Sequence, residues 1–191
     1  MPLLKGEVDS RSEDGEVTAP AKSSAPLRAK ENYLCEVIVL ICRFLTDEDK
    51  KAICSWKYDG EYAVYNLPSY ETLKQSQSGY MNPEKENNYR VFKSSDNIIG
   101  YINLVERETQ VYIGIGVNPN FLNKGFGTQI LLEGYKLSKE LYPQKSLCLE
   151  VRTWNKRAIR CYEKAGFTIE AEAYERETPI GVGYFYRMIK L

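Results

Sequence analysis

Residues Asn118 to Leu131 read NPNFLNKGFGTQIL, and this stretch decides how the rest of the chain is interpreted. It contains a proline, two glycines one residue apart, and then an apolar run. The strand-like run TQVYIGIGV precedes it and ends at Val117, while the residues from Gly125 to Leu141 have the apolar spacing of a long helix. The stretch therefore predicts a strand, a glycine-containing turn and the start of a helix.

The predicted turn could bind a phosphate group. Backbone N–H groups in the first turn of a helix have no partner, and the helix dipole favours an anion there. Gly125 and Gly127 would let a pyrophosphate approach the backbone, Lys124 could add a charge and Thr128 a hydrogen bond. The spacing matches neither the P-loop nor the dinucleotide motif G-x-G-x-x-G. On spacing alone, an ordinary turn into a core-packed helix is an equally good interpretation.

Composition indicates one soluble globular domain. The chain has 191 residues, 43% of them hydrophobic and 27% charged, with a formal net charge of zero. This balance favours neither nucleic acid nor a membrane as partner. The apolar run at residues 34–45 is too short and too charged to span a bilayer, and it is predicted to be a buried strand over residues 36–44.

The chain contains no histidine, which excludes Ser-His-Asp and Cys-His catalysis and histidine-based zinc sites. We predict no metal site. The five cysteines form no C-x-x-C pair and are expected to be buried free thiols of a cytoplasmic protein; they are Cys35, Cys42, Cys54, Cys148 and Cys161.

The order of predicted elements indicates one sheet. Residues 1–32 lack aromatic side chains and are predicted to be a disordered polar tail, and residues 33–191 to be the folded domain. Further strands are expected at residues 88–94, 97–107, 109–117, 145–153, 167–175 and 183–191, and helices at residues 47–56, 69–76, 125–141 and 155–165. Gly134 lies on the apolar face of the longest helix, so that helix is expected to lie close to the sheet.

Two separated motifs resemble the GCN5-related N-acetyltransferase (GNAT) family. The first consists of Val117, Pro119, Gly125 and Gly127, and the second is NKRAIRCYEKAGF at residues 155–167. The resemblance implies the acyl-CoA N-acyltransferase fold: an α/β (α+β) domain with a single mixed, mostly antiparallel sheet and helices on both faces. It also implies acetyl-CoA as co-substrate and the transfer of its acetyl group to an amine.

The same resemblance implies roles for individual residues. The strand before the turn would pair with the pantetheine arm, the loop would hold the pyrophosphate by its N–H groups, and Asn155 would contact the arm. Tyr162 would be the general acid, although an aromatic residue packed on the inner face of its helix is the alternative. The family has Gln or Arg where this chain has Leu122. The cofactor-binding residues so implied are Ile115, Gly116, Val117, Asn123, Lys124, Gly125, Phe126, Gly127, Thr128 and Asn155.

The general base and the acceptor site are less well defined by the sequence. The position where relatives often have a glutamate is Val111, and the nearby carboxylates Glu106, Glu108 and Glu150 remain alternatives. A water chain, or an amine that arrives already neutral, would need no side-chain base. Three tyrosines at i, i+4 and i+7 form either a core stripe or an acceptor wall, for which neighbouring Asp59 and Glu61 would suit a cationic amine; they are Tyr58, Tyr62 and Tyr65.

The sequence thus predicts an N-acetyltransferase that acts on a small-molecule amine or a protein N-terminus. An antibiotic, a polyamine, an amino acid and a ribosomal-protein N-terminus all remain possible acceptors. The alternatives are a binding module that holds acyl-CoA without transfer and a domain with no cofactor. Either a monomer or a homodimer is compatible with the sequence.

Overall fold

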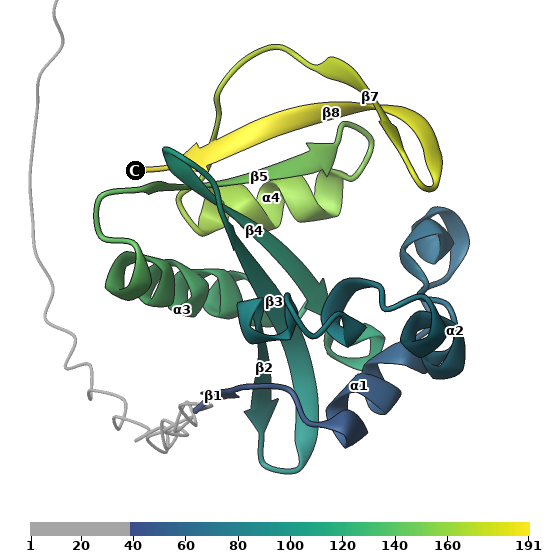
Figure 1. Ribbon diagram of the computed structural model, residues 1–191. Coiled ribbons are helices and arrows are strands. Elements are labelled where there is room, and N and C mark those ends of the chain that lie inside the picture. The colour runs from purple at the N-terminus through teal and green to yellow at the C-terminus, as the bar shows by residue number, and fades with distance from the viewer. Residues whose placement is uncertain (1–38) are drawn as a thin grey trace, which may run out of the picture. The chain divides into compact units, whose positions relative to one another are not determined.

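The computed structural model of the chain describes residues 39–191, and the predicted polar tail at residues 1–32 lies outside this range (Figure 1). Within the described range, eight strands form one sheet in the order β1-β2-β3-β4-β5-β8-β6, and β7 also pairs with β8. The strands are β1 (Ile41–Arg43), β2 (Tyr89–Ser94), β3 (Asn97–Glu106), β4 (Gln110–Val117), β5 (Ser146–Arg152), β6 (Thr168–Ile169), β7 (Tyr174–Thr178) and β8 (Gly181–Lys190).

Four α-helices and four short 3₁₀-helices connect these strands. The α-helices are α1 (Asp47–Cys54), α2 (Tyr70–Gln75), α3 (Phe126–Leu141) and α4 (Lys156–Lys164). The 3₁₀-helices are η1 (Gly60–Tyr65), η2 (Gly79–Met81), η3 (Glu86–Asn88) and η4 (Pro119–Phe121), all counted within residues 39–191. The polar segment at residues 82–88 ends in η3.

The sheet is mixed and mostly antiparallel, as predicted. Only β4 and β5 pair in parallel; every other neighbouring pair within the described residues is antiparallel. The strands expected at residues 88–94, 97–107 and 109–117 are β2, β3 and β4, which form an antiparallel meander, and a three-residue connection at residues 107–109 joins the last two strands.

Each face of the sheet has its own core. On one face, Phe126 and Ile130 of α3 and Ile159 of α4 pack with Ile102 of β3. On the other face, Ile53 of α1 packs in a second cluster whose partly buried members include Tyr101 of β3 and Tyr70 of α2. Because successive strand residues point to opposite faces, Tyr101 and Ile102 belong to different cores. The prediction of helices on both faces is therefore confirmed.

Local sequence signals account for the helix boundaries. Thr46 caps α1 in a capping box with Asp49, whose carboxylate accepts from the Thr46 backbone N–H at 2.8 Å. Gly166 follows α4 with a φ of 87°, a left-handed conformation that glycine adopts readily at a helix C-terminus. At Gly134 a methyl group would stand 2.8 Å from Ile113 Cδ1, so the predicted close approach of α3 to the sheet is confirmed.

Three expectations about burial and strand length are wrong. The run predicted as a buried strand over residues 36–44 forms only β1, an edge strand that pairs with β2 alone within the described residues, and Ile41 is 57% exposed; residues 36–38 lie outside the described range. The apolar spacing places Leu141 on the core-facing side of the long helix, but it is exposed because it is the final residue of α3, whereas Ser138 is buried. Of the cysteines, Cys54 and Cys148 are buried free thiols as expected, but Cys42 is exposed and Cys161 is only half-buried; Cys35 lies outside the described residues.

The single strand expected at residues 167–175 is interrupted. Ile169 pairs with Met188, and Tyr174 pairs with Phe185. The chain thus advances five residues along one strand while β8 advances three, so two residues are extra and the segment bends out of the sheet. The result is two strands, β6 and β7, in place of one.

Candidate acetyl-CoA site

The strands β4 and β5 separate after a short paired region. Their parallel register covers Gln110–Tyr112 against Ser146–Cys148 and then stops, although both strands continue. Figure 1 shows the two strands diverging beyond this point. The remaining part of β5 is held on its other edge by β8. Within residues 39–191 a gap therefore opens in the middle of the sheet, with one unpaired strand edge on each side.

The backbone of β4 offers hydrogen-bonding groups to this gap. The Asn118 N–H donates to the Ile99 carbonyl at 2.9 Å, so Asn118 faces β3. Backbone groups alternate in direction along a strand, and those of Ile113, Ile115 and Val117 consequently point away from β3 and into the gap. Of the three residues predicted to pair with a pantetheine arm, Ile115 and Val117 face the gap, whereas the backbone of Gly116 faces its partner Tyr101.

The predicted phosphate loop lies at the end of β4 and leads into α3. Asn123 and Gly125 have positive φ values of 61° and 84°, and Gly125 is the N-cap of α3 without a side-chain cap. The N–H groups of Phe126 and Gly127, the first two helical residues, consequently have no partner within the helix. This arrangement can bind an anion. The Lys124 side chain reaches back to η4, where its Nζ donates to the Asn120 carbonyl at 3.1 Å.

The structure supplies a packing reason for Gly127. A methyl group at this position would stand 2.8 Å from the Cys161 sulfur of α4. Thr128 also faces this sulfur, with its hydroxyl 3.6 Å away. At Gly125, by contrast, a methyl group would meet nothing, and its positive φ is the reason for glycine. The glycine pair thus shapes the turn at one residue and brings α3 against α4 at the other.

Tyr162 follows Cys161 in α4 and is therefore close to the first turn of α3. Its ring packs against the main core, with its centroid 6.4 Å from that of Phe167. Burial raises the pKa of the phenol, the neighbouring Cys161 and Tyr65 raise it further, and Arg157 lowers it. The phenol is therefore protonated at neutral pH and can donate a proton. Its hydroxyl has no hydrogen-bond partner within residues 39–191.

The predicted tyrosine wall connects the two sides of the gap. The Tyr58 hydroxyl donates to the Val117 carbonyl at 2.8 Å, on the β4 side. The Asn155 side chain donates to the Tyr65 hydroxyl at 3.1 Å, on the side of β5 and α4. Neither core cluster includes Tyr58, Tyr62 or Tyr65. The core-stripe interpretation is therefore wrong, and burial beside the gap raises the pKa of Tyr58 to about 12.

Two further side chains, Trp154 and Arg157, belong to the wall but were not predicted from the sequence. The Trp154 ring lies 5.7 Å from that of Tyr62 and 5.9 Å from that of Tyr65. Both tyrosines reach it because residues three apart share one face of a 3₁₀-helix. The Arg157 guanidinium lies 3.8 Å from the Tyr62 ring centroid. Both residues stand next to Asn155 in the sequence WNKR at residues 154–157, and their closeness to this predicted cofactor-binding residue could have indicated them.

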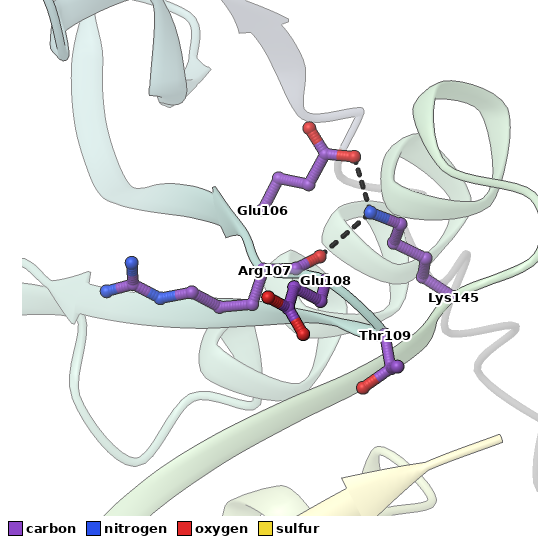
Figure 2. A pocket seen from close by; sticks show the side chains of 5 residues that line it. All are labelled: Glu106, Arg107, Glu108, Thr109 and Lys145. Carbon is purple, nitrogen blue, oxygen red and sulfur yellow. Dashed lines mark hydrogen bonds and ion pairs between the residues drawn. The ribbon is translucent and has the colours of Figure 1, made fainter.

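The three possible bases lie in different places. Glu106 and Glu108 line a shallow pocket at the β3–β4 connection, where Lys145 Nζ donates to the Glu106 carboxylate at 2.6 Å (Figure 2). This pocket is at the opposite end of β4 from the phosphate loop, about 24 Å away along an eight-residue strand. Glu150 follows Cys148, the last paired residue of β5, by two positions, so it faces the same side of the sheet where the gap begins.

Asn155 uses both ends of its side chain. Its Oδ1 accepts from the Ala158 N–H at 3.0 Å and caps α4, while its Nδ2 donates to Tyr65. We expect Asn155→Ala to lower the free energy of unfolding by about 1 kcal/mol, measured by chemical denaturation. Asn155→Asp is the control, because it keeps the capping oxygen and should retain most of the stability. An alanine variant as stable as the wild type would contradict the capping role.

Comparison with known proteins agrees with this geometry. Residues 50–167, more than half of the chain, match the model of the Acetyltransferase (GNAT) family. The chain therefore belongs to the GNAT acetyltransferase family, whose co-substrate is acetyl-CoA. Within residues 39–191, none of the helices combines the length and the apolar character needed to cross a bilayer.

The individual proteins similar to this chain share limited sequence identity with it. An N-alpha-acetyltransferase from Sulfurisphaera tokodaii is 36% identical over 72 residues, which cover 36% of this chain and 43% of that protein. The matched region thus spans less than half the length of this curated relative. A GNAT-family acetyltransferase from Bacillus anthracis has a TM-score of 0.65 at 16% identity and covers 80% of this chain and 94% of its own. Spermidine N-acetyltransferase from Vibrio cholerae, solved with CoA and spermine, has a TM-score of 0.63 at 21% identity, with 79% and 94% covered. These likenesses confirm the acyl-CoA N-acyltransferase fold.

Proposed function

We propose that this protein transfers the acetyl group of acetyl-CoA to the primary amine of a small molecule or of a protein N-terminus. The observation that carries the proposal is the gap between β4 and β5, where, within residues 39–191, the backbone groups of Ile113 and Ile115 point away from β3 without a strand partner and the first turn of α3 lies at the end. An extended pantetheine arm fits such an edge in the way that an added strand does. A pyrophosphate fits the turn at residues 123–128.

The residues around the gap can supply the chemistry of acetyl transfer. Acetyl-CoA supplies a thioester, whose carbonyl carbon is the electrophile. A backbone N–H of β4 that points into the gap can stabilise the charge that develops on the thioester oxygen. Tyr162, whose phenol is protonated, can donate a proton to the departing sulfur.

Glu150 is the carboxylate best placed to take a proton from the acceptor amine. Unlike Glu106 and Glu108, it lies where the paired part of β4 and β5 ends. Its carboxylate accepts from the Tyr174 hydroxyl at 2.5 Å and pairs with Arg176. The side chain is 21% exposed, so an amine or a bridging water can reach it. We assign Glu150 as the general base.

Release of free thiol from acetyl-CoA across a panel of amines tests the proposed function. The panel should contain peptides with free N-termini, amino acids, polyamines and aminoglycosides, and a reaction without amine is the control. We expect thiol release well above that control with at least one acceptor. If calorimetry detects acetyl-CoA binding but no amine causes thiol release, the protein is instead a module that binds acyl-CoA without transfer. Leu122, which stands where the family has Gln or Arg, also favours this alternative.

A further inference from the structure

A positive charge occupies the centre of the tyrosine wall. The Arg157 guanidinium stacks on Tyr62, and its charge lowers the pKa values of Tyr58, Tyr65 and Tyr162 against the effect of burial. All four tyrosines around the gap are therefore close to one cation. Within residues 39–191 the Arg157 side chain forms no ion pair with a carboxylate.

The position of Arg157 in α4 is unfavourable for the helix itself. Arg157 is the second helical residue, and the first turn of α4 has no acidic side chain. The helix dipole places positive potential at this end, where an anion is stabilising and a cation is not. Helix α1, by contrast, has Asp47, Glu48 and Asp49 in its first turn. Helix stability therefore gives no reason for a guanidinium at residue 157.

A second guanidinium without a counter-ion lies beside the wall. Arg152 is the last residue of β5 and is only 9% exposed. Its positive charge lowers the pKa of Tyr65 against the effect of burial. It stacks on Phe185 at 4.9 Å and donates to the Thr178 hydroxyl at 3.1 Å, but it pairs with no carboxylate in the part of the chain that the structure describes. Gly183 leaves room for it, because a side chain there would collide with the guanidinium. Burying an unpaired charge is costly unless an anion approaches.

We propose that the acceptor carries a carboxylate close to its amine, as an acidic peptide N-terminus does, and that Arg157 and Arg152 bind this carboxylate. The inference rests on the proposed function and narrows its acceptor class. Two unpaired cations beside the wall repel a polyamine and attract an anionic group. Asp59 and Glu61 do not counter this preference, since both side chains are exposed and the face of Tyr62, which a cationic amine would need, is already occupied by Arg157.

Matched peptide acceptors test this selectivity. Two tetrapeptides with the same N-terminal residue, one continuing with two glutamates and one with two lysines, are compared with spermidine in the thiol-release assay. We expect the wild type to use the acidic peptide with a kcat/KM at least roughly tenfold above the basic peptide and spermidine. Arg157→Gln should lower kcat/KM for the acidic peptide by about tenfold, should not lower it for the basic peptide, and should leave the KM for acetyl-CoA unchanged.

Arg160→Gln is the matched control, because Arg160 is an exposed arginine of the same helix three residues further on. It should leave the ratio between the two peptides unchanged. A wild type that prefers spermidine or the lysine peptide overturns the inference while supporting acetyl transfer. An Arg157→Gln effect that is equal for all acceptors, or confined to the KM for acetyl-CoA, also overturns it.

Binding measurements separate the inference from the proposed function. If no acceptor releases thiol, acetyl transfer fails as the function, and calorimetry with the two peptides still decides the role of Arg157. Tighter binding of the acidic peptide by the wild type than by Arg157→Gln supports the inference, and equal binding by both proteins refutes it.

Discussion

Replacing Tyr162 by Phe should lower kcat by about 10²-fold or more, with little change in the dissociation constant of acetyl-CoA. The substitution removes only the hydroxyl, so the ring keeps its packing against Phe167 in the core. The departing sulfur then leaves without a proton donor, which slows the chemical step alone. Steady-state thiol release and calorimetric titration with acetyl-CoA measure the two quantities separately.

Tyr135→Phe is the matched control for this experiment. Tyr135 is in α3, and its hydroxyl donates to the backbone carbonyl of Leu191 at 2.6 Å, away from the gap. Its loss should leave kcat unchanged. Because burial raises the pKa of Tyr162 above the ordinary value of 10.0, the phenol remains protonated as the pH rises to 10. The wild-type kcat should therefore show no loss from Tyr162 ionisation below that pH, and an unaltered kcat in Tyr162→Phe would remove the residue from the mechanism.

Replacing Glu150 by Gln should lower kcat/KM for the acceptor by about 10²-fold at neutral pH. Glutamine has the same shape but cannot take a proton from the attacking amine. The deficit should shrink as the pH approaches the pKa of the acceptor itself, because the amine then arrives neutral. A pH profile of the variant relative to the wild type measures this rescue, which a merely structural role for Glu150 would not produce.

Glu106→Gln is the control for the base. Glu106 pairs with Lys145 at the opposite end of β4, and an exposed pair of this kind contributes little to stability. Its replacement should leave kcat/KM unchanged. A deficit in Glu150→Gln that stays constant across the pH range would contradict general-base catalysis and would point to the loss of the Arg176 partner.

The sequence predicted most of the fold because the relevant signals are local. The cap at Thr46, the cap at Asn155 and the left-handed Gly166 each depend on residues within one helical turn. The phosphate loop was predictable for the same reason, since its turn and the following helix are adjacent in the chain. The split of residues 167–175 was not predictable, because it depends on how many residues β8 places opposite them.

The candidate site was only partly predictable. The three tyrosines were found from their spacing, but a stripe at i, i+4 and i+7 fits a core helix equally well. Their contacts with Val117 and Asn155 join residues 59 and 90 positions apart, and no local pattern encodes such contacts. Arg157 stood inside a recognised motif, yet its position over Tyr62 depends on how η1 lies across the gap.

By itself, the sequence determined the order of the elements, their caps, the turn that can hold a phosphate and the family to which the chain belongs. Only the tertiary structure decided where β4 and β5 separate, which of three glutamates lies beside that separation, and which cations lie at the tyrosine wall. The physical reason is the distance along the chain between the residues that interact. Caps and turns are fixed by hydrogen bonds within a few residues, whereas the gap depends on pairing between distant strands: β5 continues along β8 after its pairing with β4 has ended.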